Sequence, residues 1–226
     1  MEPYSHGALA LLALVSGVYL LFWRKNFTLD SVKEYFFWFA LFFLYNATLA
    51  TAAVFFPLYP VVAATGYILA LFVLALGAWH GFRIGLRFLN TSKSLYNLLS
   101  KAYITGVLAA VFLHVLFFEL PQVADENWLF WYTNRPVSLF YALFMFIAGW
   151  TVSFSMLKAV ASLVRQSFKI RALLIAGAAF LLPIAAIFFF GVTQVSHIVL
   201  SLWLVGIALV LFLVGNILPG LARRIG

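Results

Sequence analysis

The sequence of 226 residues contains no cysteine and few charged residues. Without cysteine, structural disulfides, thiolate catalysis and cysteine-ligated metal or iron–sulfur sites are excluded. Charged residues make up 9% of the chain, against about 25% in an ordinary soluble domain. Acidic residues are also missing from the middle of every long apolar run. This absence argues against a proton-coupled pump, which needs carboxylates within the membrane.

The sequence also lacks the common motifs of membrane enzymes. It contains no H-E-x-x-H, no G-x-S-x-G and no D-x-x-D pair within an apolar run. An intramembrane protease, or a metal-dependent prenyl or phosphoryl transferase, normally needs a motif of this kind. The sequence therefore predicts a protein that is not an enzyme and that has no bound cofactor.

Hydrophobic residues are abundant, at 66% of the chain. They form runs long enough for helices of roughly 20 residues, the length that crosses a bilayer core of about 30 Å. The sequence predicts an all-α, polytopic membrane protein, with a single seven-helix domain over residues 1–226. The expected spans are 7–23, 35–56, 59–82, 102–120, 137–157, 172–190 and 195–218.

The basic residues predict how the chain is oriented. If the N-terminus lies outside, 13 of the 14 basic residues fall on the side of the C-terminus, and only Arg135 lies outside. Positive charge gathers in cytoplasmic loops, so the C-terminus is expected in the cytoplasm and the protein in the cell inner membrane. The net charge of +8 is then a topology signal. No basic stretch is long enough for a nucleic-acid-binding arm.

Several polar residues lie near the expected outer ends of the spans. His114 lies about two turns in from the outer end of 102–120, Glu119 follows it, and His197 begins the last span. These residues are candidates for an outward-facing ligand or proton-sensing site. A weaker alternative is a haem or metal ion held by His6, His114 and His197. The histidines show no metal-ligand spacing, so hydrogen-bonded histidines at the membrane interface are the simpler interpretation.

The stretch "YNATLAT" places Asn46, Thr48 and Thr51 in the body of the second span. An amide without a partner in hydrocarbon is costly, so Asn46 is expected to find a polar partner on another helix. Contact between helices is the default interpretation, and ligand recognition is the alternative.

The fifth and sixth spans contain three further candidates. Trp150 and Ser153 are candidate ligand-binding residues. Pro183 in the sixth span removes one helical hydrogen bond and is expected to kink the helix. It is therefore the candidate hinge about which the two helices would shift.

The third span ends in "AWHGFRIGLRF". His80, Arg83 and Arg87 share one helix face at spacings of three and four. They predict contact with lipid headgroups or with a carboxylate of a partner, although snorkelling that merely sets topology is the simpler interpretation. The helical pattern continues to Phe88, and such a projecting end is a candidate docking surface. The same span contains a G-x-x-x-G-x-x-x-G run from Gly77, which predicts close helix approach.

Four stretches carry a family resemblance: "WRKN" after the first span, "EYFFWFALFFLYNATLA" in the second, and "IRALLIAGAAFLLPIAAIFFF" and "LWLVGIALVLFL" in the last two. In these the chain resembles the seven-helix membrane sensor modules of prokaryotic histidine kinases and cyclases. The resemblance implies a receptor-like or partner-binding subunit. Those proteins continue into a cytoplasmic output domain whereas this chain ends at Gly226, so the output is expected from a separate cytoplasmic or membrane partner. The alternatives are a small-solute transporter and a haem- or metal-binding redox subunit, and a second copy of the chain is a further candidate partner.

Overall fold

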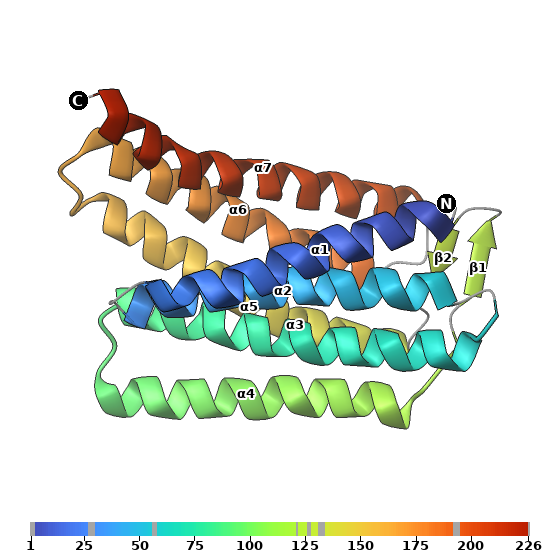
Figure 1. Cartoon of the computed structure of the whole chain (residues 1–226). Coiled ribbons are helices and arrows are strands. Elements are labelled where there is room, and N and C mark those ends of the chain that lie inside the picture. The colour runs from blue at the N-terminus through green and yellow to red at the C-terminus, as the bar shows by residue number, and fades with distance from the viewer. Residues whose placement is uncertain are drawn as a thin grey trace. The chain divides into compact units, whose positions relative to one another are not determined.

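The computed structural model describes residues 3–26, 30–55, 58–120, 122–125, 128–130, 134–191 and 195–225. These residues form seven α-helices, one 3-10 helix and a two-stranded ribbon (Figure 1). The predicted all-helical architecture is confirmed, with the ribbon as a small addition. In chain order the elements are α1 (Pro3–Trp23), η1 (Arg24–Asn26), α2 (Asp30–Phe55), α3 (Pro60–Phe88), α4 (Lys93–Leu116), β1 (Gln122–Asp125), β2 (Trp128–Phe130), α5 (Arg135–Val160), α6 (Gln166–Gly191) and α7 (Val195–Ile225).

Five helices contain stretches that are long and apolar enough to cross a bilayer core of about 30 Å. These stretches are Phe36–Phe55, Pro60–Phe88, Lys93–Leu116, Arg135–Val160 and Gln166–Phe190. In α1 and α7 the described apolar segments are shorter, Ala10–Phe22 and Val199–Phe212. The structure thus supports a membrane protein with five apolar helices of spanning length, whereas the sequence predicts seven.

The local sequence explains where several helices begin. Pro60 opens α3, and Pro136 is the second residue of α5. Proline suits this position because its missing N–H would have no helical partner in the first turn. Ser92 precedes α4 and its Oγ accepts a hydrogen bond from the N–H of Leu95 at 3.4 Å, as a helix-capping serine does.

The buried and exposed side chains are distributed as expected for a protein in lipid. Many of the buried residues are alanines, including Ala40, Ala63, Ala70 and Ala75, each at 0% exposure. Large apolar side chains such as Leu12 and Trp203 are instead exposed. Lipid offers no hydrophobic driving force between helices, so small residues that allow close approach take the contact positions.

The chain forms two compact units. Unit 1 comprises Met1–His80 with Ala102–Tyr141, and unit 2 comprises Gly81–Lys101 with Ala142–Gly226. Helices α3, α4 and α5 therefore contribute residues to both units. Within unit 1, α1 packs along α2, and within unit 2, α6 packs along α7.

Candidate functional site

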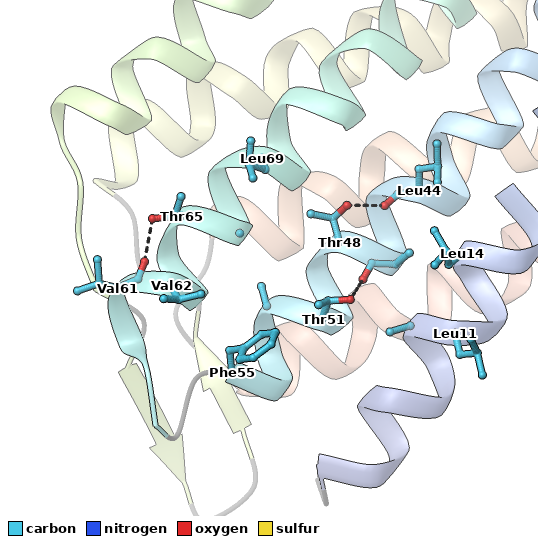
Figure 2. Close-up of a pocket in the computed structure, with 14 residues that line it drawn as sticks. Leu11, Leu14, Leu44, Thr48, Thr51, Phe55, Val61, Val62, Thr65 and Leu69 are labelled. Carbon is cyan, nitrogen blue, oxygen red and sulfur yellow. Dashed lines mark hydrogen bonds between the residues drawn. The ribbon is translucent and has the colours of Figure 1, made fainter. Parts of the chain in front are cut away.

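A groove of about 680 Å³ lies in unit 1 between α1, α2 and α3. Figure 2 shows its lining residues, which come from all three helices. They are Ala10, Leu11, Leu14, Leu44, Ala47, Thr48, Thr51, Ala52, Phe55, Val61, Val62, Thr65, Gly66 and Leu69. Leu11 and Val61 are 63% and 60% exposed. The groove is therefore open along the outside of the unit.

The polar side chains of this groove are three threonines. Each hydroxyl donates to the carbonyl four residues earlier in its own helix, as the dashed lines in Figure 2 show. The distances are 2.8 Å from Thr48 to Leu44, 2.7 Å from Thr51 to Ala47 and 2.9 Å from Thr65 to Val61. Because these donors are engaged within their helices, the lining offers an occupant mainly alkyl groups and one phenyl ring.

Asn46 lies two residues before Thr48 on α2 but does not line the groove. Its Nδ2 donates to the carbonyl of Phe42 in its own helix at 2.8 Å. The sequence predicts a partner on another helix, whereas the structure satisfies this amide donor locally. An asparagine side chain can do so because the carbonyl four residues earlier is within its reach.

His114 is buried in unit 1, with 1% of its surface exposed. Its Nδ1 lies 2.8 Å from the carbonyl oxygen of Ala110, which can only accept, so Nδ1 carries the proton. Its Nε2 then presents a lone pair, and this buried atom has no hydrogen-bond partner among the described residues. The imidazole meets the ring of Tyr141 edge-on, at 5.6 Å between centroids. The Tyr141 hydroxyl donates to the carbonyl of Leu71 in α3 at 2.7 Å.

The other candidates that the sequence predicts for the outer side each have surroundings of their own. Glu119 is exposed and lies beyond Leu116, where α4 ends. His197 belongs to unit 2, where its ring stacks on Phe188 at 5.8 Å. The side chain of His6 is outside the described part of the chain. Within that part, no three His, Asp or Glu side chains are placed to hold a metal ion.

Trp150 and Ser153 occupy different environments in unit 2. The Trp150 ring is 45% exposed and stacks on Phe146 at 5.0 Å, with Phe180 at 5.6 Å. Ser153 is buried. Trp150 is therefore part of an aromatic surface cluster that α5 and α6 form together.

Pro183 is buried, and α5 approaches it at a glycine. A Cβ atom on Gly149 would lie 2.6 Å from the carbonyl oxygen of Ala179 and 2.7 Å from Cγ of Pro183. The Ala179 carbonyl has no helical donor because Pro183 lacks an N–H. Sequence reasoning identified the proline but missed Gly149, since a glycine within a helix does not show which backbone it faces.

The inner-face candidates are divided between the two units. His80 in unit 1 meets Phe37 edge-on at 4.6 Å. In unit 2, the Nε of Arg83 donates to the hydroxyl of Tyr96 at 2.8 Å, and the Arg87 guanidinium lies 5.7 Å from the centroid of the same ring. The two arginines therefore share an aromatic partner on α4.

Comparison with known proteins adds no family to this description. No protein-family model matches the chain, and no curated protein or solved structure matches it.

Proposed function

We propose that this chain is a non-enzymatic, receptor-like membrane protein that binds a lipophilic ligand in the groove between α1, α2 and α3. The observation that carries the proposal is the lining, whose three hydroxyl donors are bonded to their own helices. A polar ligand would find little to replace its bonds to water there. The volume of about 680 Å³ falls within the range of about 300–1,000 Å³ that is typical of small-molecule sites.

A photoactivatable alkyl probe tests the groove directly. The full chain in lipid nanodiscs is labelled with a diazirine-bearing fatty acid, and the labelled residues are mapped by mass spectrometry. We expect saturable labelling of groove residues, which Val62→Trp reduces because indole fills the groove. Val210→Trp is the matched control, since Val210 on α7 is exposed to a similar degree, 58% against 52%. Labelling spread evenly over exposed apolar residues, or equal effects of both variants, would contradict the proposal.

Seven membrane crossings with the N-terminus outside form part of the same proposal. The shorter apolar segments of α1 and α7 belong to helices that pack along α2 and α6, both of spanning length. The distribution of basic residues favours a cytoplasmic C-terminus. Reporter fusions at residues 2 and 226 should report opposite compartments, and the same compartment for both would overturn the orientation.

Pro183 is the proposed hinge that would couple ligand binding to a separate cytoplasmic or membrane partner. Since the chain has no cysteine, spin labels can be placed on α6 at Ile170→Cys and Ile187→Cys without background. The two sites lie about 25 Å apart along a straight helix and flank the proline. We expect the alkyl probe to shift the distance distribution, and Pro183→Ala to abolish that shift. A distribution that the probe leaves unchanged would rule out the hinge.

A haem- or metal-binding subunit is the second candidate, because Nε2 of His114 presents a buried lone pair. Neutral imidazole nitrogen is a common ligand of transition metals. A visible absorption spectrum and metal analysis of the purified chain test this candidate. A signal that His114→Ala removes would favour it, and a blank in both measurements would eliminate it.

A further inference from the structure

A fixed turn joins α3 to α4 within unit 2. Asn90 adopts a left-handed conformation with φ of 57°, and its N–H donates to the carbonyl of Arg87 at 3.0 Å. The hydroxyl of Thr91 donates to the carbonyl of Leu86 at 2.9 Å. Asparagine tolerates this conformation better than most residues and commonly ends helices in this way. The capped turn therefore fixes the orientation of the start of α4 relative to the end of α3.

A pocket of about 420 Å³ opens at this turn, lined by Arg87, Asn90, Thr91, Lys93 and Tyr96. Among the described residues its lining contains two cations, an amide and two hydroxyl groups, and no carboxylate. It is polar, unlike the apolar groove of unit 1.

Tyr96 is held in place by the arginines of α3. Its hydroxyl accepts the hydrogen bond from Nε of Arg83, and its ring lies 5.9 Å and 5.7 Å from the guanidinium carbons of Arg83 and Arg87. Both distances are within the reach of about 6 Å for a cation–π contact. The aromatic ring thus orders one wall of the pocket.

The local sequence makes the pocket electropositive. Residues 81–101 include Arg83, Arg87, Lys93 and Lys101 but no aspartate or glutamate. The first turn of α4 also contains no acidic residue, and the positive end of its helix dipole lies at Lys93. Among charged side chains, an anion entering the pocket would therefore meet only positive ones.

The length of α3 relates this pocket to the depth at which a bilayer presents phosphate groups. Helix α3 has 29 residues and so is about 43 Å long, against about 40–45 Å for a bilayer with its headgroup regions. Its end at Phe88 and the turn beyond it reach headgroup depth when the helix spans the membrane. We propose that this pocket binds the phosphate group of an anionic phospholipid, with Arg87 and Lys93 pairing its oxygens and Asn90 and Thr91 at its rim.

Native mass spectrometry of the full chain in detergent tests the proposal with three probes: short-chain phosphatidic acid, short-chain phosphatidylcholine and inorganic phosphate. We expect phosphatidic acid to bind more tightly than phosphatidylcholine. The double variant Arg87→Gln/Lys93→Gln should weaken its binding by about tenfold or more, because two cations at the site are lost.

The matched control is Lys101→Gln/Arg165→Gln, which removes the same two charges from unit 2 at exposed residues outside the pocket. We expect it to change binding of phosphatidic acid by less than about twofold, because surface charges act weakly at a distance. An equal loss of affinity for phosphatidic acid in both double variants, or equal affinity for the two lipids, would contradict the assignment of the binding site to this pocket. Binding of inorganic phosphate alone, lost in the pocket variant, would overturn the assignment to a lipid.

Discussion

The two units of this chain differ sharply in charge. Unit 1 contains all six acidic residues and four of the 14 basic residues, whereas unit 2 contains the other ten basic residues and no acid. The charged side chains of unit 2 are therefore all positive, and no carboxylate side chain of that unit can pair with them. The distinctive features of unit 1 are instead an apolar groove and a buried histidine.

The units also differ in how closely their helices approach. In unit 1 the tight contact at Gly66 is with a methyl group, the Cβ of Ala52. In unit 2 the contacts at Gly85 and Gly149 include backbone atoms as well as side chains, with the carbonyl oxygen of Thr151 at 3.0 Å and that of Ala179 at 2.6 Å. Backbone cannot move aside as a side chain can, so the comparison indicates that unit 2 is less tolerant of added volume.

The largest effect is expected from Gly149→Ala in unit 2. The new methyl group would lie 2.6 Å from the carbonyl oxygen of Ala179 and 2.7 Å from the Pro183 ring, and overpacking of this kind costs about 1–3 kcal/mol. We expect that loss in the free energy of unfolding, measured by dodecyl sulfate titration and tryptophan fluorescence. Gly206→Ala is the control because nothing lies within 4 Å of its Cβ position. Equal stability of the two variants would refute the close contact.

An intermediate effect is expected from Gly66→Ala in unit 1. Its methyl group would lie 2.7 Å from Cβ of Ala52, so α2 and α3 must shift apart at a cost of about 1 kcal/mol. The double variant Gly66→Ala/Ala52→Gly should recover most of the loss in the same titration, because the methyl group is moved from one helix to the other. Failure to recover would mean that the two residues do not meet.

The smallest effects are expected where an interhelical hydrogen bond is removed from each unit. Tyr141→Phe removes the bond to the Leu71 carbonyl in unit 1, and Ser201→Ala removes the bond to the Ala185 carbonyl in unit 2. Each should cost about 0.6 kcal/mol, the average for hydrogen bonds between helices within membranes. Tyr59→Phe, at an exposed residue, is the control. If Ser201→Ala lowered the free energy of unfolding by more than Gly149→Ala does, the expected ranking of contacts in unit 2 would be wrong.

The sequence predicted the helices more successfully than the site. Apolar runs and prolines located all seven helices, and the glycine run from Gly77 predicted the close contacts at Gly77 and Gly85. The site was only partly visible, since Thr48 and Thr51 stand out as polar residues in a span whereas Leu11 and Val62 look like any lipid-facing residue. A concave lining formed by three helices leaves no periodic pattern in any one of them.

The sequence by itself determined that most of this chain forms long apolar helices, and that its acids and bases are segregated along the chain. Both follow from amino-acid composition and hydrophobic periodicity, which are properties of single segments of the chain. Only the tertiary structure decided that Asn46 bonds to its own helix, that Gly149 faces the backbone freed by Pro183, and that α1, α2 and α3 leave a groove between them. These features depend on which helix faces interlock, and in lipid that is decided by packing between segments rather than by the hydrophobic pattern of any one of them.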